Sequence, residues 1–202
     1  MQRASGVAGG ECFLTELGEL FGALQRVDGC FTQTGSTNSW QRQTAILTGE
    51  IMDALALGDP DSIRALAEDL DGDPIDVLVN NAGTYGLKNF AEGGMQAQAF
   101  GSMEYDGLEH ALGINTMAPL RMIEALIGNV AKSAQKKIFT VSSSMGSIGE
   151  PPGGHLAYGS TKAAVNFVMS TLAMELRDRG ITVMSLHPGW VETDMGGATA
   201  PL

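Results

Sequence analysis

Two side chains in the second half of the chain have types and a spacing that suit proton transfer. Tyr158 and Lys162 stand four residues apart, so on a helix they share one face. A free tyrosine has a pKa of about 10 and is a poor acid or base at neutral pH. Because a neighbouring ammonium favours the phenolate, we expect Lys162 to lower the pKa of Tyr158. Such a pair suits proton transfer coupled to hydride transfer, although a half-buried ring beside a solvated charge would give the same spacing.

Three polar segments each follow a short apolar run of the kind that forms a buried strand. The runs are 74–80, 137–141 and 181–186, and the segments after them are 80–83, 142–146 and 187–190. Ligands of open parallel sheets bind at the carboxyl ends of the strands, so we expect the three segments to meet at one edge. There a serine hydroxyl could hold a substrate oxygen beside Tyr158. Each segment alone is also compatible with a simple polar turn.

The elements that must position these residues alternate between strand and helix. Helical periodicity predicts the ranges 61–71, 104–131 with a bend near Pro119, and 156–179 ended by Gly180. A short strand is expected at 53–57, a helix at 11–24 and a loop at 28–43. This alternation predicts an α/β fold, a Rossmann-like doubly wound parallel sheet covered on both faces. The length of 202 residues favours one domain spanning 1–202.

The composition excludes several classes of partner. Hydrophobic residues make up 44% of the chain and the net charge is −11, so an acidic surface repels nucleic acid and anionic lipid. No apolar run is long enough to cross a bilayer, and no signal peptide is visible, so we expect a cytoplasmic protein that binds no membrane. The cysteines and histidines lack metal-ligand spacing, so no metal is expected. These residues are Cys12, Cys30, His110, His155 and His187.

The segments together resemble one family. Residues 52–198 are similar to the short-chain dehydrogenase/reductase family, and the serine and His-Pro-Gly-Trp segments resemble its C-factor and sniffer-like carbonyl reductases. The matching segments are DVLVNNAG (76–83), INTMAPLR (114–121), VSSSMGSIG (141–149), YGSTKAAV (158–165) and HPGWVETDMGG (187–197). The resemblance implies an oxidoreductase that transfers a hydride between NAD or NADP and a small carbonyl compound or alcohol.

The resemblance also implies roles for individual residues. The catalytic tetrad would be Asn115, Ser143, Tyr158 and Lys162. Tyr158 would exchange the proton, Lys162 would bind the nicotinamide ribose, and Asn115 would hold a water. The remaining residues implied in cofactor binding are Asn81, Ala82, Gly83, Pro188, Gly189, Val191 and Thr193.

The chain departs from the family pattern at its two ends. The Thr-Gly-x-x-x-Gly-x-Gly turn that receives the pyrophosphate is missing, and the glycines of 5–10 have a different spacing. Ala56 stands where the family has an adenine-contacting Asp. We therefore expect an atypical segment 1–50 and a truncated C-terminus. The competing hypothesis is a non-enzymatic signalling or interaction protein similar to C-factor.

The predicted helices carry apolar residues on more than one side. Ala163, Ala164, Phe167 and Val168 are expected to face away from the stripe that contains Tyr158. One sheet face cannot cover all of these, and the family resemblance implies a two-fold dimer through these helices. We therefore expect a homodimer.

Overall fold

The computed structural model describes residues 44–45, 58–70, 72–88 and 92–190, all within one compact unit, Thr32–Leu202. The helix expected at 11–24, the loop at 28–43 and the strand at 53–57 lie outside the described residues. The elements in order are β1 (Thr44–Ala45), α3 (Pro60–Asp69), β2 (Val77–Asn80), η1 (Gln96–Gln98), α4 (Tyr105–Leu112), the π-helical η2 (Gly113–Met117), α5 (Ala118–Lys132), β3 (Lys137–Val141), η3 (Ser144–Gly146), α6 (Leu156–Glu175), η4 (Arg177–Arg179) and β4 (Thr182–Leu186).

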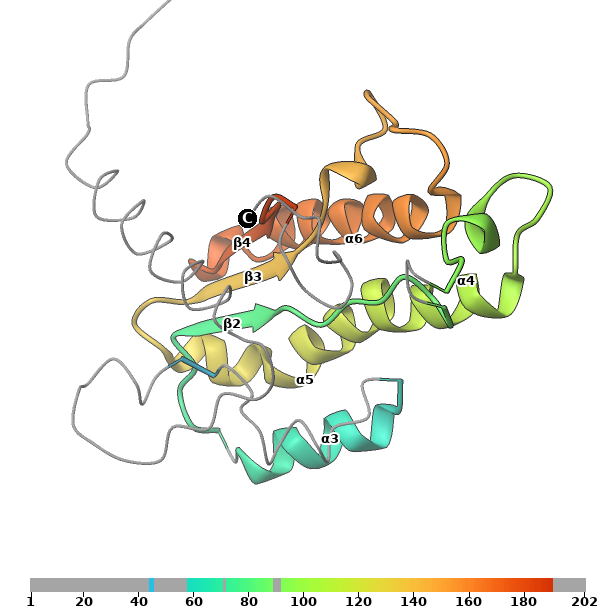
Figure 1. Cartoon of the computed structure of the whole chain (residues 1–202). Helices are drawn as coiled ribbons and strands as arrows, with labels where there is room; N and C mark the ends of the chain where they lie inside the picture. The colour runs from blue at the N-terminus through green and yellow to red at the C-terminus, as the bar shows by residue number, and fades with distance from the viewer. Residues whose placement is uncertain (1–43, 46–57, 71, 89–91, 191–202) are drawn as a thin grey trace, which may run out of the picture. The chain divides into compact units, whose positions relative to one another are not determined.

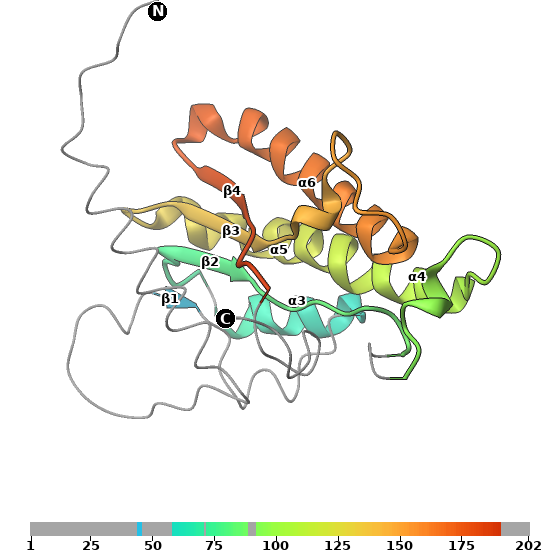
Figure 2. The same cartoon turned by 45° about the horizontal axis from the view of Figure 1, so that its top comes forward.

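The four strands form one parallel sheet in the order β1-β2-β3-β4. The register places Leu78 beside Ile138, and Ile138 beside Val183. These three side chains point to the same face, where α3, α5 and α6 pack side by side (Figure 1, Figure 2). The predicted α/β fold with a parallel sheet is confirmed. The described helices cover this one face of the sheet.

α3 begins at Pro60, directly after the capping residue Asp59. The Asp59 carboxylate accepts a hydrogen bond of 3.0 Å from the Asp61 N–H, and Pro60 follows at the first helical position, where no amide proton is needed. Ile63 and Leu66 are buried on the inner side. The helix spans 60–69 instead of the predicted 61–71.

The long helix predicted at 104–131 consists of three pieces. α4 ends at Leu112, the π-helical η2 follows, and α5 continues to Lys132. Pro119 has no amide proton for the carbonyl of Asn115, four residues earlier, so the α-helical ladder cannot run through this point. The Ala118 N–H instead bonds to the carbonyl of Gly113, five residues back. The predicted bend is therefore a π-helical segment before the proline.

α6 brings the predicted apolar stripe to the core. Tyr158, Lys162, Val165 and Met169 are all buried on it, at intervals of three and four residues. The helix ends at Glu175 and the short η4 is closed by Gly180, whose φ of +69° is typical of a helix stop. The sequence predicts one helix over 156–179, and the structure divides this interval into α6 and η4. The core of buried side chains on this face comprises Ile63, Leu66, Ile75, Leu78, Met122, Ile123, Leu126, Val130, Ile138, Val165, Met169, Leu176, Ile181 and Val183.

Candidate active site

The carboxyl ends of β2, β3 and β4 lie together at one edge of the sheet. The Asn80 amide donates to the Thr140 hydroxyl at 3.2 Å, which joins the ends of β2 and β3. The Ser142 N–H donates to the carbonyl of Leu186 at 2.7 Å, which joins the ends of β3 and β4. The three polar segments therefore meet at one edge of the sheet, as the sequence predicts.

Ser143 and Tyr158 face each other at this edge. Ser143 caps η3, and its hydroxyl oxygen accepts the Met145 N–H at 3.2 Å. That bond leaves the hydroxyl proton for Tyr158, and the hydrogen bond from Ser143 lowers the pKa of the tyrosine. Tyr158 lies in the first turn of α6 and is only 8% exposed. A substrate carbonyl between the two hydroxyls would meet two hydrogen-bond donors.

Two glycines allow η3 to approach α6. A Cβ atom on Gly146 would lie 2.6 Å from the carbonyl carbon of Lys162, and one on Gly159 would lie 3.0 Å from the Met145 oxygen. Both contacts are with backbone atoms, which cannot swing aside. The glycine three residues after Ser143 is therefore what lets the serine lie against the helix that carries Tyr158.

Burial has the largest effect on the pKa of Tyr158. Desolvation and the nearby Tyr85 raise the pKa of Tyr158 to about 12, and the Ser143 hydrogen bond only partly opposes them. The expectation that Lys162 lowers this pKa is wrong for this arrangement. The reason is that the phenol is desolvated, and the Lys162 ammonium lies 5.5 Å from the ring centroid and donates to the carbonyl of Val141 at 2.9 Å.

Lys162 is itself perturbed by its surroundings. Its side chain lies one turn beyond Tyr158 on the buried side of α6. Desolvation disfavours the charged form and lowers the pKa of Lys162 to about 8. At neutral pH the group therefore remains mostly an ammonium that can donate hydrogen bonds.

Asn115 fastens the loop after β2 to α6. Its Oδ1 accepts the Thr84 N–H at 2.8 Å, and its Nδ2 donates to the Thr84 carbonyl at 2.8 Å and to the Thr161 hydroxyl at 2.9 Å. Thr161 in turn donates to the carbonyl of Tyr158 at 2.8 Å. Asn115 is 1% exposed and both of its amide protons are used within the protein. In this structure the side chain fixes the loop against the first turns of α6.

Three residues near Tyr158 were not identified from the sequence. The Tyr85 ring stacks on the Tyr158 ring at 4.6 Å with planes 5° apart. The Tyr85 hydroxyl and His155 Nδ1 share a hydrogen bond of 3.3 Å. Gln98 accepts the Tyr158 N–H at 2.8 Å through its side-chain oxygen. Tyr85 and Gln98 lie in 84–103, which has no periodicity that could have revealed them, and His155 directly precedes α6.

The predicted cofactor residues lie at the same edge as far as the structure describes them. Asn81 is exposed, and Ala82 and Gly83 are half-buried directly after β2. Pro188 and Gly189 are half-buried after β4, and Gly189 has a φ of +87°. Val191 and Thr193 lie outside the described residues.

The described ranges contain neither a cluster of metal ligands nor a membrane-spanning helix. Among residues 58–70, 72–88 and 92–190 no three His, Cys, Asp or Glu side chains gather in a way that could hold a metal ion. Within the same part of the chain, every helix is too short or too polar to cross a bilayer.

Comparison with known proteins identifies one family over most of the chain. Residues 41–201 match the family model described as short chain dehydrogenase. The chain is 37% identical to C-signal of Myxococcus xanthus over 141 residues, which cover 69% of this chain and 80% of C-signal.

Solved structures give the same result. The NADPH-bound carbonyl reductase from chicken fatty liver is 33% identical with a TM-score of 0.59, over 71% of this chain and 59% of the reductase. The carbonyl reductase Sniffer of D. melanogaster is 32% identical with a TM-score of 0.64, over 72% of this chain and 62% of Sniffer. The chain thus spans less than two thirds of either reductase.

Proposed function

The chain belongs to the short-chain dehydrogenase family, and from that premise we propose that it reduces small carbonyl compounds with NADPH or NADH. The observation that carries the proposal is the approach of the Ser143 hydroxyl to Tyr158, with Lys162 one helical turn away. The bound nicotinamide would supply the hydride. The groups of this chain would bind the carbonyl oxygen and provide the proton.

Tyr158 has the properties of an acid. A phenol with a pKa of about 12 stays protonated at neutral pH, and an alkoxide is a stronger base than its phenolate. The proton can therefore pass from Tyr158 to the oxygen of the reduced carbonyl. The reverse reaction would need the phenolate, whose formation burial disfavours.

Lys162 and the strand ends fit one half of the cofactor. The Lys162 ammonium has three N–H groups and uses one on the carbonyl of Val141, which leaves two for ribose hydroxyls. The segments 81–83 and 188–189 would line the dinucleotide along the edge of the sheet. The residues that would receive the pyrophosphate are not among those described.

The competing proposal is that the chain signals or binds partners without turnover. Two observations favour it: the Gly-rich phosphate turn is missing from the sequence, and C-signal is 37% identical. Fold alone does not establish activity. The two proposals make opposite predictions about nicotinamide binding.

The test is to titrate NADPH and NADH while following protein fluorescence, and then to follow oxidation of the nucleotide with small aldehydes and ketones. The reductase proposal requires binding, and binding that weakens in Lys162→Ala. If neither nucleotide binds at millimolar concentration, the reductase proposal is refuted. The competing proposal of a signalling or interaction protein is then supported.

We further propose a two-fold dimer through α6. Phe167 is 74% exposed and Met174, two turns further along the same side, is also exposed. Two large apolar side chains exposed on the same side of one helix support an association surface. Val168, which the sequence placed with Phe167, packs in part against the core, so it contributes less to this surface than expected.

A further inference from the structure

Tyr85 lies flat against the ring of the residue that we assign as proton donor. The centroids of the Tyr85 and Tyr158 rings are 4.6 Å apart, and the ring planes differ by 5°. Stacked aromatic pairs attract each other beyond the area that they bury, and at this separation no water fits between the rings. The Tyr158 side chain cannot swing toward this side while the Tyr85 ring is in place.

The hydroxyl end of Tyr85 is held by the two segments that carry the reaction centre. The hydroxyl shares a hydrogen bond of 3.3 Å with Nδ1 of His155, the residue directly before α6. It also donates to Sδ of Met145 at 3.7 Å, within the short helix η3 that Ser143 caps. Tyr85 is therefore connected both to the helix of Tyr158 and to the helix beside Ser143.

The backbone before Tyr85 is fixed by Asn115. The N–H and the carbonyl of Thr84 both bond to the Asn115 side chain, each at 2.8 Å. Asn115 is buried in the π-helical η2, where hydrogen bonds are shielded from competing water. The chain therefore enters Tyr85 from a position that the helix layer sets.

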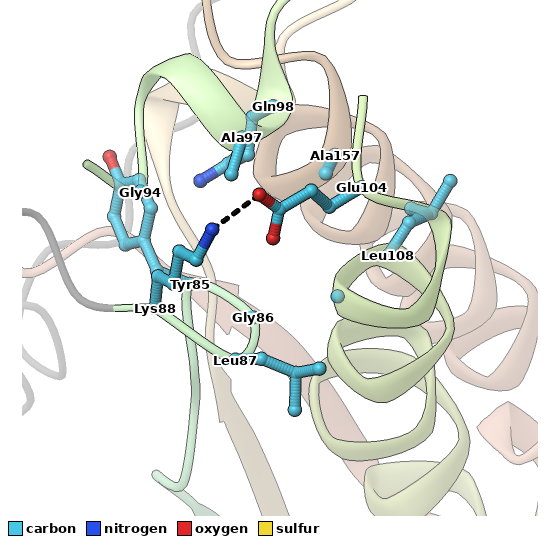
Figure 3. Close-up of a pocket in the computed structure, with 11 residues that line it drawn as sticks. Tyr85, Gly86, Leu87, Lys88, Gly94, Ala97, Gln98, Glu104, Leu108 and Ala157 are labelled. Atoms are coloured by element: carbon cyan, nitrogen blue, oxygen red, sulfur yellow. Dashed lines mark hydrogen bonds and ion pairs between the residues drawn. The ribbon is translucent and has the colours of Figure 1, made fainter. Parts of the chain in front are cut away.

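Two contacts fix the chain after Tyr85. Gly86 has a φ of +131°, and a Cβ atom there would lie 3.2 Å from the Gly107 carbonyl oxygen, so this turn packs directly against the backbone of α4. Lys88 then forms an ion pair with Glu104 in the pocket beside Tyr85 (Figure 3). Because the chain is held on both sides, Tyr85 has a fixed position although it belongs to no helix or strand.

A proton donor must point at the substrate oxygen when the hydride arrives. The Ser143 hydrogen bond restrains only the hydroxyl end of Tyr158, and the side chain still has two torsions about which it can turn. A displacement of about 1 Å at a reacting group can cost about 10²-fold in rate. A ring stacked on Tyr158 excludes the orientations that turn toward Tyr85.

On the basis of the proposed reductase activity, we propose that Tyr85 is a positioning residue for proton transfer. Its ring holds the Tyr158 ring in the orientation in which the Tyr158 hydroxyl faces Ser143 and the substrate oxygen. Tyr85 acts through this contact and takes no part in the proton transfer itself. Removal of the ring should therefore slow the chemical step and leave the binding of ketone and NADPH largely unchanged.

Three variants separate the stacked ring from the space that it fills. Tyr85→Met fills much of this space with a flexible apolar side chain but has no ring to stack. Tyr85→Phe keeps the ring and loses only the hydroxyl. Tyr105→Met makes the same change at a tyrosine that is 70% exposed at the start of α4, and is the matched control.

The first measurement is the single-turnover rate of NADPH oxidation with a methyl ketone, together with the ketone concentration that half-saturates it. In Tyr85→Met the rate should fall about tenfold or more, while half-saturation stays within about threefold of the wild type. Tyr85→Phe should recover most of the lost rate, and Tyr105→Met should behave as the wild type.

Three kinetic results would overturn the assignment. A weaker half-saturation with an unchanged rate would make Tyr85 a substrate contact. A lower thermal midpoint with both kinetic quantities unchanged would make it a packing residue only. An equal loss of rate in Tyr85→Phe and Tyr85→Met would assign the effect to the hydroxyl and not to the stacked ring.

A second measurement does not depend on turnover. The chain has three tyrosines, so NMR of protein labelled at its tyrosine rings gives three ring systems, which Tyr85→Phe and Tyr105→Phe assign. Wild type should show a nuclear Overhauser cross peak between the rings of Tyr85 and Tyr158, with and without NADPH. If Tyr85→Met does not fold, this cross peak decides the question, and its absence from the NADPH complex overturns the proposal. A wild type that shows the cross peak but reduces no ketone refutes the reductase, and with it any role of Tyr85 in proton transfer.

Discussion

Replacing Tyr158 by phenylalanine removes one oxygen atom from the site and keeps the ring that stacks on Tyr85. Loss of a general acid typically costs about 10²–10⁴-fold in rate, or about 3–5 kcal/mol of transition-state stabilisation. The lost hydroxyl also gives up one hydrogen bond with Ser143, which contributes only about 1 kcal/mol to folding. A domain with about 5–15 kcal/mol of stability stays more than about 99% folded after such a loss.

The two magnitudes differ enough to separate chemistry from folding. The assay compares kcat/KM for a methyl ketone in wild type and Tyr158→Phe, with the thermal midpoint and NADPH affinity measured on the same samples. Tyr105→Phe removes the same atom from an exposed tyrosine at the start of α4 and should change none of these. A Tyr158→Phe rate within about threefold of the wild type would refute the role of Tyr158 as proton donor.

Three further changes test the packing, the electrostatics and the assembly. Gly146→Ala should lower the free energy of unfolding in urea by about 1–3 kcal/mol because its Cβ would meet the backbone of α6, whereas Gly149→Ala, with open space around it, should not. Because the folded-state pKa of Lys162 lies at about 8, below its unfolded value, the unfolded chain binds more protons above pH 8. The free energy of unfolding should therefore rise between about pH 8 and pH 10 by up to about 3 kcal/mol; in Lys162→Met this rise should be absent, and an equal rise in both would contradict the burial argument. Phe167→Asp should give a monomer mass by light scattering, while the exposed Ala65→Asp on α3 should leave a dimer; a monomeric wild type would contradict the dimer.

The core of the fold could be predicted because its signals are local. The apolar runs that became β2, β3 and β4 are short and bounded by polar residues, and the stripe from Tyr158 to Met169 has a clear helical period. Gly180 predicts the end of the helical segment before β4 because glycine readily adopts the positive φ that stops a helix. Strand β1, with two residues, is too short to produce a pattern.

The parts that were missed depend on contacts between distant residues. Gln98 and Tyr85 reach Tyr158 across 60 and 73 positions, from a stretch with no regular period. The π-helical segment around Asn115 follows from the lack of an amide proton on Pro119, which the sequence indicated only as a bend. The pKa of Tyr158 was predicted in the wrong direction because spacing reveals a charged neighbour but not the loss of water around the hydroxyl.

The order of strands in the sheet also bears on how the protein is made. From β2 to β4, every strand pairs with the described strand before it in the sequence, and the connections between them are helical. The described strands can therefore join the sheet in the order in which the chain leaves the ribosome. Tyr158 and Lys162 lie on α6, between β3 and β4, so the reaction centre is assembled only after β2 and β3 have been made.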